Sequence, residues 1–114
     1  MSRARRTVGL VPFVAVALAI ASPAAAAAPT KPKVHRIVMA SMGFGPAPAG
    51  VRAGDTIVWV NKDIFRHTAT ARDKSFEVDL APGKEGRTVV RKPGQIAYFC
   101  RFHPGMTGKL AVAP

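Results

Sequence analysis

The sequence is poor in cysteine, in acidic residues and in any sustained helical pattern, and each shortage excludes a class of protein. Only one Cys is present, so the chain cannot build an intramolecular disulfide framework. We find no pair of catalytic carboxylates, no Ser/His/Asp set and no phosphate-binding glycine loop, so we do not expect an enzyme. A length of 114 residues allows one small domain.

The N-terminus has the three-part layout of a secretory signal peptide. Basic residues precede an apolar run over 8–21, and small residues follow up to position 28. We place cleavage after Ala26 or Ala27, which makes 1–27 the signal peptide. The general secretory route fits better than the twin-arginine route, because Gly9 stands where a bulky apolar residue is usual. The basic residues are Arg3, Arg5 and Arg6.

Export changes the meaning of the positive charge. Removing three of the 17 basic residues and none of the 6 acidic ones lowers the formal charge from +11 to +8. We expect a periplasmic or otherwise exported protein that binds no nucleic acid, with a basic surface that attracts acidic partner proteins. If the apolar segment is not cleaved, it is long enough to anchor the protein in a membrane, since about 20 residues span a bilayer.

The rest of the chain has the pattern of short strands. After a lead-in over 28–33 that we expect to be flexible, apolar or alternating runs are separated by Gly-Asp and Pro-Gly turns. Phe76, Val78 and Leu80 alternate with acidic residues, as in a strand with one buried face. The pattern predicts one all-β domain over 34–114, an antiparallel sandwich or barrel. The expected strands cover 34–39, 56–60, 76–80, 88–90, 96–100 and 110–112.

Four side chains with metal-binding chemistry stand out. Cys100, His103 and Met106 follow one another at C-x2-H-x2-M spacing, and His67 lies 33 residues before the cysteine. Each alone is more often a core or surface residue than a ligand. Together they are the two-His, one-Cys, one-Met set of mononuclear blue-copper electron-transfer sites. A single cysteine excludes the dinuclear copper centre of oxidases, which needs two thiolates.

Several segments resemble cupredoxins, the type 1 blue-copper proteins, of the plastocyanin, amicyanin and pseudoazurin group. They are residues 55–61 (DTIVWVN), 80–83 (LAPG), 92–94 (KPG) and 98–110 (YFCRFHPGMTGKL), and the short ligand loop most resembles amicyanin. The resemblance covers Val34 to Val112. It implies a Greek-key β-sandwich with one copper ion near one end, and a mobile carrier of single electrons between redox proteins.

The resemblance also implies a role for each ligand. His67, Cys100 and His103 would be the equatorial ligands and Met106 the long axial one, with His103 at the solvent edge. We expect Phe65, Phe102, Pro104 and Gly105 to form an apolar docking patch around His103.

The ligand segments depart from the family pattern at four positions. Thr68 stands where the family usually has Asn; its backbone N–H can still donate to the Cys100 sulfur, but the side-chain link between the ligand segments must differ. Arg66 replaces a common Pro, and Arg101 and Phe102 fill the loop differently from amicyanin. We expect such changes to tune the reduction potential and loop stiffness more than the choice of metal.

Two alternatives remain at this stage. Met39 and Met42 have a spacing seen in Cu(I)-handling proteins, which would favour copper sequestration or delivery, although Met39 also lies on an apolar strand face and fits the core. The second alternative is a structural role in which the protein binds zinc or no metal. We expect Trp59 in the core, His35 exposed at a strand start, and a monomer.

Overall fold

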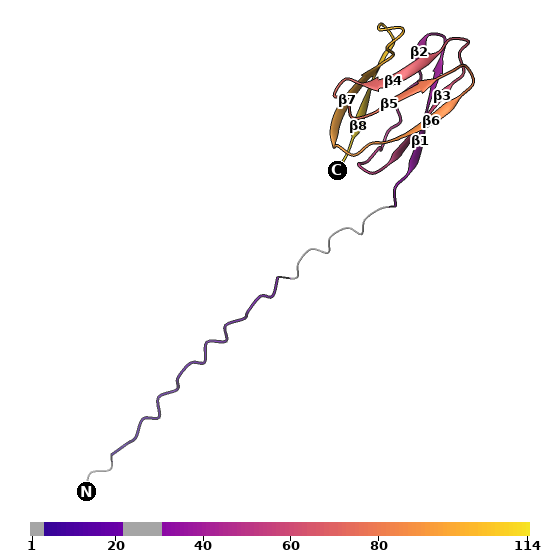
Figure 1. Cartoon of the computed structure of the whole chain (residues 1–114). Helices are drawn as coiled ribbons and strands as arrows, with labels where there is room; N and C mark the ends of the chain where they lie inside the picture. Colours follow the sequence, from indigo (N-terminus) through magenta and orange to yellow (C-terminus); the bar gives the residue numbers. More distant parts are fainter. Residues whose placement is uncertain (1–3, 22–30) are drawn as a thin grey trace.

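The computed structural model describes residues 4–21 and 31–114, and its strands form two four-stranded sheets (Figure 1). The described residues contain no helix. The strands are β1 (Val34–Ala40), β2 (Gly43–Phe44), β3 (Thr56–Asn61), β4 (His67–Ala71), β5 (Glu77–Leu80), β6 (Glu85–Val89), β7 (Gly94–Phe99) and β8 (Thr107–Val112).

The two sheets have the orders β2-β1-β3-β6 and β5-β4-β7-β8. The predicted all-β sandwich is thereby confirmed. All neighbouring strands are antiparallel except β1 and β3, which run parallel over six residue pairs, from Val34 opposite Thr56 to Met39 opposite Asn61. The sequence did not indicate this pairing. A parallel pair needs a connection that returns to the starting end of the sheet, and residues 45–55 provide it.

Strand β4 was not among the expected strands, yet it carries one of the predicted ligands. Its sequence is HTATA, which lacks the large apolar residues that mark the other strands. The strand lies between β5 and β7, and four of its five residues are buried. Small side chains suit this crowded position. The sequence of β4 shows no strand pattern because neighbouring strands bury it, while its own side chains are small and mostly not apolar.

An aromatic cluster occupies the space between the sheets. Trp59 is fully buried, with its ring edge-on to Phe44 and Tyr98 at centroid distances of 6.0 and 5.1 Å. Its indole N–H donates to Thr88 Oγ1 at 2.9 Å, so burial leaves no polar group unpaired on the ring. Met39 is also completely buried. The predictions of Trp59 and Met39 as core residues are confirmed.

Tyr98 lies directly opposite Gly108 on the paired strands β7 and β8. A Cβ atom at position 108 would lie 2.3 Å from Tyr98 Cε2, closer than two non-bonded carbon atoms can approach. Glycine is therefore required here by the close approach of the tyrosine ring. The contact holds β7 against β8 close to where the chain leaves β7 at Phe99 and returns at Thr107.

The expectation that His35 is exposed is wrong. The side chain is half-buried, and its Nε2 lies 2.9 Å from Asp55 Oδ2. The parallel pairing causes this, because it aligns the start of β1 with the start of β3, beside the turn that ends at Asp55. The buried Asp55 carboxylate also accepts hydrogen bonds from the backbone N–H groups of Lys33 and Arg52. The hydrogen bond from the Lys33 N–H, together with those from His35 and Arg52, lowers the pKa of Asp55 to about 2. Burial of the carboxylate acts in the opposite direction but is outweighed.

The N-terminal segment is described in part. Residues 4–21 form neither helix nor strand, and within the described ranges no helix is long and apolar enough to cross a membrane. The expected cleavage after Ala26 or Ala27 lies outside the described residues, as do residues 28–30 of the expected lead-in. The signal peptide stays a prediction.

Candidate metal centre

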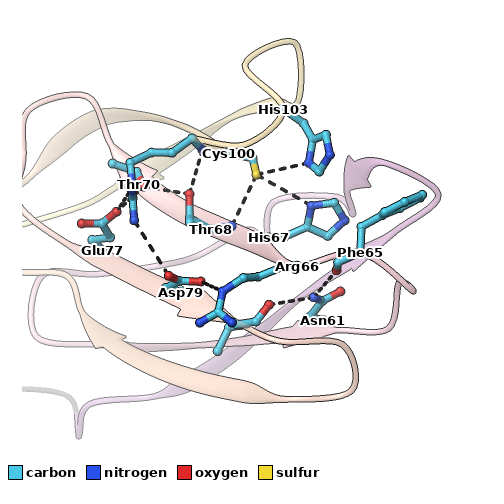
Figure 2. Close-up of polar contacts among 12 residues, drawn as sticks. Asn61, Phe65, Arg66, His67, Thr68, Thr70, Glu77, Asp79, Cys100 and His103 are labelled. Carbon is cyan, nitrogen blue, oxygen red and sulfur yellow. Dashed lines mark hydrogen bonds and ion pairs between the residues drawn. The ribbon is translucent and has the colours of Figure 1, made fainter.

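The fold brings three of the four predicted ligands together at one end of the sandwich. His67 is the first residue of β4, Cys100 follows the last residue of β7, and His103 lies in the loop between β7 and β8. The Cys100 Sγ atom lies 3.7 Å from Nδ1 of His67 and 3.7 Å from Nδ1 of His103 (Figure 2). The three ligand atoms all lie within 4.8 Å of one another.

These separations match a trigonal metal site. A metal ion bonded to nitrogen at about 2.0 Å and to sulfur at about 2.3 Å, with about 120° between the bonds, separates the two donor atoms by about 3.7 Å. Both Sγ–Nδ1 distances have this value. The residues present therefore fit a metal bound by two imidazoles and one thiolate, the donor set that is typical of blue-copper sites.

The surroundings of Cys100 lower the pKa of its thiol and so favour the thiolate. Its side chain is completely buried, and the backbone N–H of Thr68 points at Sγ from 3.4 Å. Burial raises the pKa of the thiol. The Thr68 N–H, the two imidazoles and the backbone N–H of Phe102 more than offset burial and lower the pKa of Cys100 from 9.0 to about 6. The lowered pKa favours the thiolate, which is the form that binds a metal ion.

His67 is held in position by a carboxylate that the sequence analysis missed. The imidazole is fully buried, and its Nε2 lies 2.9 Å from Asp63 Oδ2, which leaves Nδ1 directed at Cys100. Burial lowers the pKa of His67, but the contacts with Asp63 and Cys100 outweigh it and raise the pKa above its usual value. A carboxylate on the far nitrogen of a ligating histidine fixes the ring orientation. The only signal in the sequence was an Asp four residues before the His.

Asn61, the last residue of β3, organises the turn that leads to His67. Its side-chain amide donates to the carbonyl oxygens of Phe65 at 2.8 Å and of Leu80 at 3.0 Å, and its Oδ1 accepts the N–H of Asp63 at 2.9 Å. Asn61 is fully buried, so these bonds are shielded from water. The turn that carries Asp63 is therefore anchored to the body of the sandwich.

The loop after Cys100 is closed by two backbone hydrogen bonds. The N–H of Met106 donates to the His103 carbonyl at 2.8 Å, and the N–H of Cys100 donates to the Met106 carbonyl at 3.0 Å. The Met106 side chain is buried at the same end of the molecule. Its place in the tight loop is compatible with an axial ligand, and the axial role stays a prediction.

Thr68 links the two ligand segments in place of the usual Asn. Besides its N–H contact to the Cys100 sulfur, its hydroxyl oxygen accepts the backbone N–H of Arg101 at 2.8 Å. One small residue thus contacts both the sulfur ligand and the backbone that follows it. This is the altered side-chain link that the departure from the family pattern predicts.

Exposed apolar residues lie close to His103 in the sequence or contact its half-buried ring. Phe65 and Phe102 are each 47% exposed, and Pro104 and Gly105 are exposed as well. The Phe65 ring lies edge-on to the His103 ring at a centroid distance of 5.9 Å. Ile64, which the sequence analysis did not include, is 80% exposed beside Phe65. Whether this surface binds a partner stays a prediction.

Charge is distributed unevenly between the two ends of the sandwich. The ligand end, together with the charged residues that pair with it, is close to neutral. Its basic residues are Lys62, Arg66, Lys84, Arg101 and Arg36, which pairs with Glu85, and its acidic residues are Asp63, Glu77, Asp79 and Glu85. The opposite end carries five more basic than acidic residues: Lys31, Lys33, Arg52, Arg72, Lys74, Arg91 and Lys92 against Asp55 and Asp73. The surplus positive charge therefore lies away from the ligand cluster.

Comparisons with known proteins agree with this geometry. A family model described as a cupredoxin-like domain matches residues 10–112. A copper-containing nitrite reductase from Thermus scotoductus is 29% identical with a TM-score of 0.64, over 82% of this chain but only 25% of the reductase. This chain thus spans about a quarter of that enzyme.

Two smaller solved structures have the same fold. The amicyanin of Paracoccus versutus is 22% identical with a TM-score of 0.58, over 75% of this chain and 85% of amicyanin. A purple cupredoxin from Nitrosopumilus maritimus is 23% identical with a TM-score of 0.58, over 69% of this chain and 99% of its own. Cupredoxins bind one copper ion, and His67, Cys100 and His103 are placed to form its ligand site. The chain belongs to the cupredoxin-like family.

Proposed function

We propose that this protein is an exported, mononuclear blue-copper protein that carries single electrons between redox proteins. The bound copper supplies one-electron chemistry by cycling between Cu(II) and Cu(I). The observation that carries the proposal is the cluster of one thiol and two imidazoles whose ligand atoms lie within 4.8 Å of one another. Export rests on the signal-peptide pattern of residues 1–27.

Each residue has a separate task in this proposal. Cys100 provides the thiolate, kept deprotonated by the Thr68 N–H and the two imidazoles. His67 provides a nitrogen whose direction Asp63 fixes. Met106, on the closed loop, would provide a thioether ligand. Because these donors are already close together, little rearrangement is needed when the site gains or loses an electron.

Burial favours a carrier over an enzyme. His67 and Cys100 are completely buried and Met106 nearly so, while His103 is half-buried. An electron can pass through the His103 ring, whereas a substrate molecule has no comparable path to the ligand atoms. The likeness to nitrite reductase covers only a quarter of that enzyme and does not alter this argument.

The partner is expected to dock at the ligand end through apolar contacts. Ile64, Phe65 and Phe102 are exposed there, and the charges of that end nearly cancel. Redox partners bind weakly over small interfaces, for which a few exposed apolar side chains suffice. We therefore expect electron-transfer rates that depend only weakly on salt. The surplus positive charge is poorly placed to draw an acidic partner to the copper site, because that charge lies at the opposite end of the sandwich.

Copper delivery is the weaker alternative. Its motivation was the Met39 and Met42 pair, but Met39 is completely buried in the core and only Met42 is exposed. A single exposed thioether is a poor Cu(I) site. Carrier and delivery functions also differ in one measurable property, which is whether copper stays bound after reduction.

Optical spectroscopy of the purified, copper-loaded protein tests the proposal. We expect an intense blue colour from thiolate-to-copper charge transfer, reversible bleaching by a mild reductant, and copper retained through repeated cycles. Cys100→Ser should abolish the colour, while Met42→Leu, which changes an exposed residue outside the ligand set, should leave it unchanged. A Cu(II) complex without colour would refute the blue-copper assignment, and loss of copper on reduction would favour delivery.

A further inference from the structure

The two segments that carry His67 and Cys100 are joined by little backbone pairing. The ladder between β4 and β7 consists of two residue pairs, Thr70 with Phe99 and Ala71 with Tyr98. Both ligands lie beyond the end of this ladder, where the segments meet through the contacts of Thr68 with Cys100 and Arg101. Something other than strand pairing must therefore keep the ligand segments at a fixed separation.

A closed ring of polar contacts crosses this gap (Figure 2). The backbone N–H of Arg101 donates to Thr68 Oγ1 at 2.8 Å, and the Thr68 and Thr70 hydroxyl oxygens lie 3.0 Å apart. The Thr70 hydroxyl donates to Glu77 Oε1 at 3.1 Å, and the same oxygen pairs with the Arg101 guanidinium. Since Thr70 gives its only hydroxyl proton to Glu77, the Thr68 hydroxyl must donate to Thr70. The ring starts and ends at Arg101.

A second set of ion pairs extends the ring to the other ligand segment. Arg66, the residue before His67, donates from Nε to Asp79 Oδ1 at 2.6 Å. The other oxygen of Asp79 lies 3.9 Å from a guanidinium nitrogen of Arg101, the residue after Cys100. Glu77 and Asp79 both belong to β5, which pairs with β4 along its length. Each ligand segment is thus attached through an arginine to the same short strand.

We propose that Glu77 and Asp79 are positioning residues that, through Arg66 and Arg101, hold the ligands His67 and Cys100 at binding distance before the metal arrives. We call this group the β5 clamp: Arg66, Thr68, Thr70, Glu77, Asp79 and Arg101. The inference rests on the proposed copper site. The clamp uses charged partners that are partly exposed, so salt weakens it. It also explains the arginines on both sides of the cluster, which the family pattern does not require.

Amide hydrogen exchange in the metal-free protein tests the clamp. The reporter is the Arg101 N–H, which Thr68 Oγ1 accepts. One variant is Thr70→Val, which opens the ring without changing the net charge, and the other combines Glu77→Gln with Asp79→Asn. The matched control is Glu85→Gln, because Glu85 lies on β6 in the other sheet and pairs with Arg36 at 3.8 Å.

We expect Arg101 amide exchange to accelerate about tenfold in both clamp variants, roughly the effect of losing one ordinary hydrogen bond. High salt should accelerate the same amide in the unaltered protein, and Glu85→Gln should leave it unchanged. Copper-loaded Thr70→Val should also show a shifted reduction potential, although its net charge is that of the unaltered protein.

Unchanged Arg101 exchange in Thr70→Val would overturn the clamp. Acceleration spread evenly over all amides would overturn it as well, since the variants would then only destabilise the fold. The proposed function has a separate test, because an unaltered protein that binds copper without blue colour would refute that function. The exchange experiment on the metal-free protein decides about the clamp in either case.

Discussion

The acidity of the Cys100 thiol is the property of this site that can be tested most directly. In the metal-free protein we expect the thiol to titrate near pH 6, because the Thr68 N–H and two imidazoles stabilise the thiolate against the cost of burial. About nine-tenths of the molecules then carry a thiolate at pH 7, compared with about one-hundredth for a thiol with a pKa of 9.0. The difference of three pH units corresponds to roughly 4 kcal/mol in favour of the charged form.

The titration can be followed by the ultraviolet absorbance of the thiolate, with His103→Ala as the informative variant. Removing one of the two imidazoles that face Sγ should move the midpoint upward and reduce the thiolate fraction at pH 7. The matched control is His35→Ala, which removes a histidine at the opposite end of the sandwich. Copper binding requires the thiolate, so affinity should fall by about tenfold per pH unit below the midpoint. A midpoint near 9 in the unaltered protein would refute the reasoning.

Three further predictions follow from particular contacts. The folded-state pKa of Asp55 is about 2, below the ordinary 3.8, so its carboxylate stabilises the fold by about 2 kcal/mol above about pH 4, and this stabilisation is lost as the pH falls toward 2. In urea unfolding between pH 2 and 5, Asp55→Asn should lack this part of the acid sensitivity. An equal pH dependence of the variant and the unaltered protein would contradict the prediction. Gly108→Ala should destabilise the protein by about 1–3 kcal/mol, because the added Cβ meets the Tyr98 ring. Gly105→Ala, with open space around it, should be nearly neutral in thermal unfolding. Equal stability of the two variants would argue against the clash. Met106→Leu should keep the blue colour and shift the reduction potential, measured by voltammetry, and loss of all visible absorption would contradict the axial role.

The ligand cluster was predictable from the sequence because most of it is local. Cys100, His103 and Met106 lie within seven residues, so their spacing and chemistry could be read without knowing the fold. His67 was found because few histidines compete for the role and because its surroundings resemble a known family. The strand pattern likewise predicted the sandwich, since apolar alternation reports directly which face of a strand is buried.

What the sequence did not indicate depends on contacts between distant segments. The parallel pairing of β1 and β3 cannot be read from either strand, and it is the reason that His35 is half-buried beside Asp55. The positioning role of Asp63 depends on how the turn after β3 folds back. The carboxylates of β5 looked like ordinary exposed positions of an alternating strand, and only the register with β4 shows that they face the arginines beside both ligands.

Strand β5 has a second consequence, for the behaviour of the protein at high concentration. It is an edge strand of its sheet, and the edge of a sheet can pair with a strand from another molecule. β5 has only four residues, and two of them are charged. A short, charged edge is a poor template for strand addition. The carboxylates that pair with the two arginines thus also protect this edge of the sheet against aggregation.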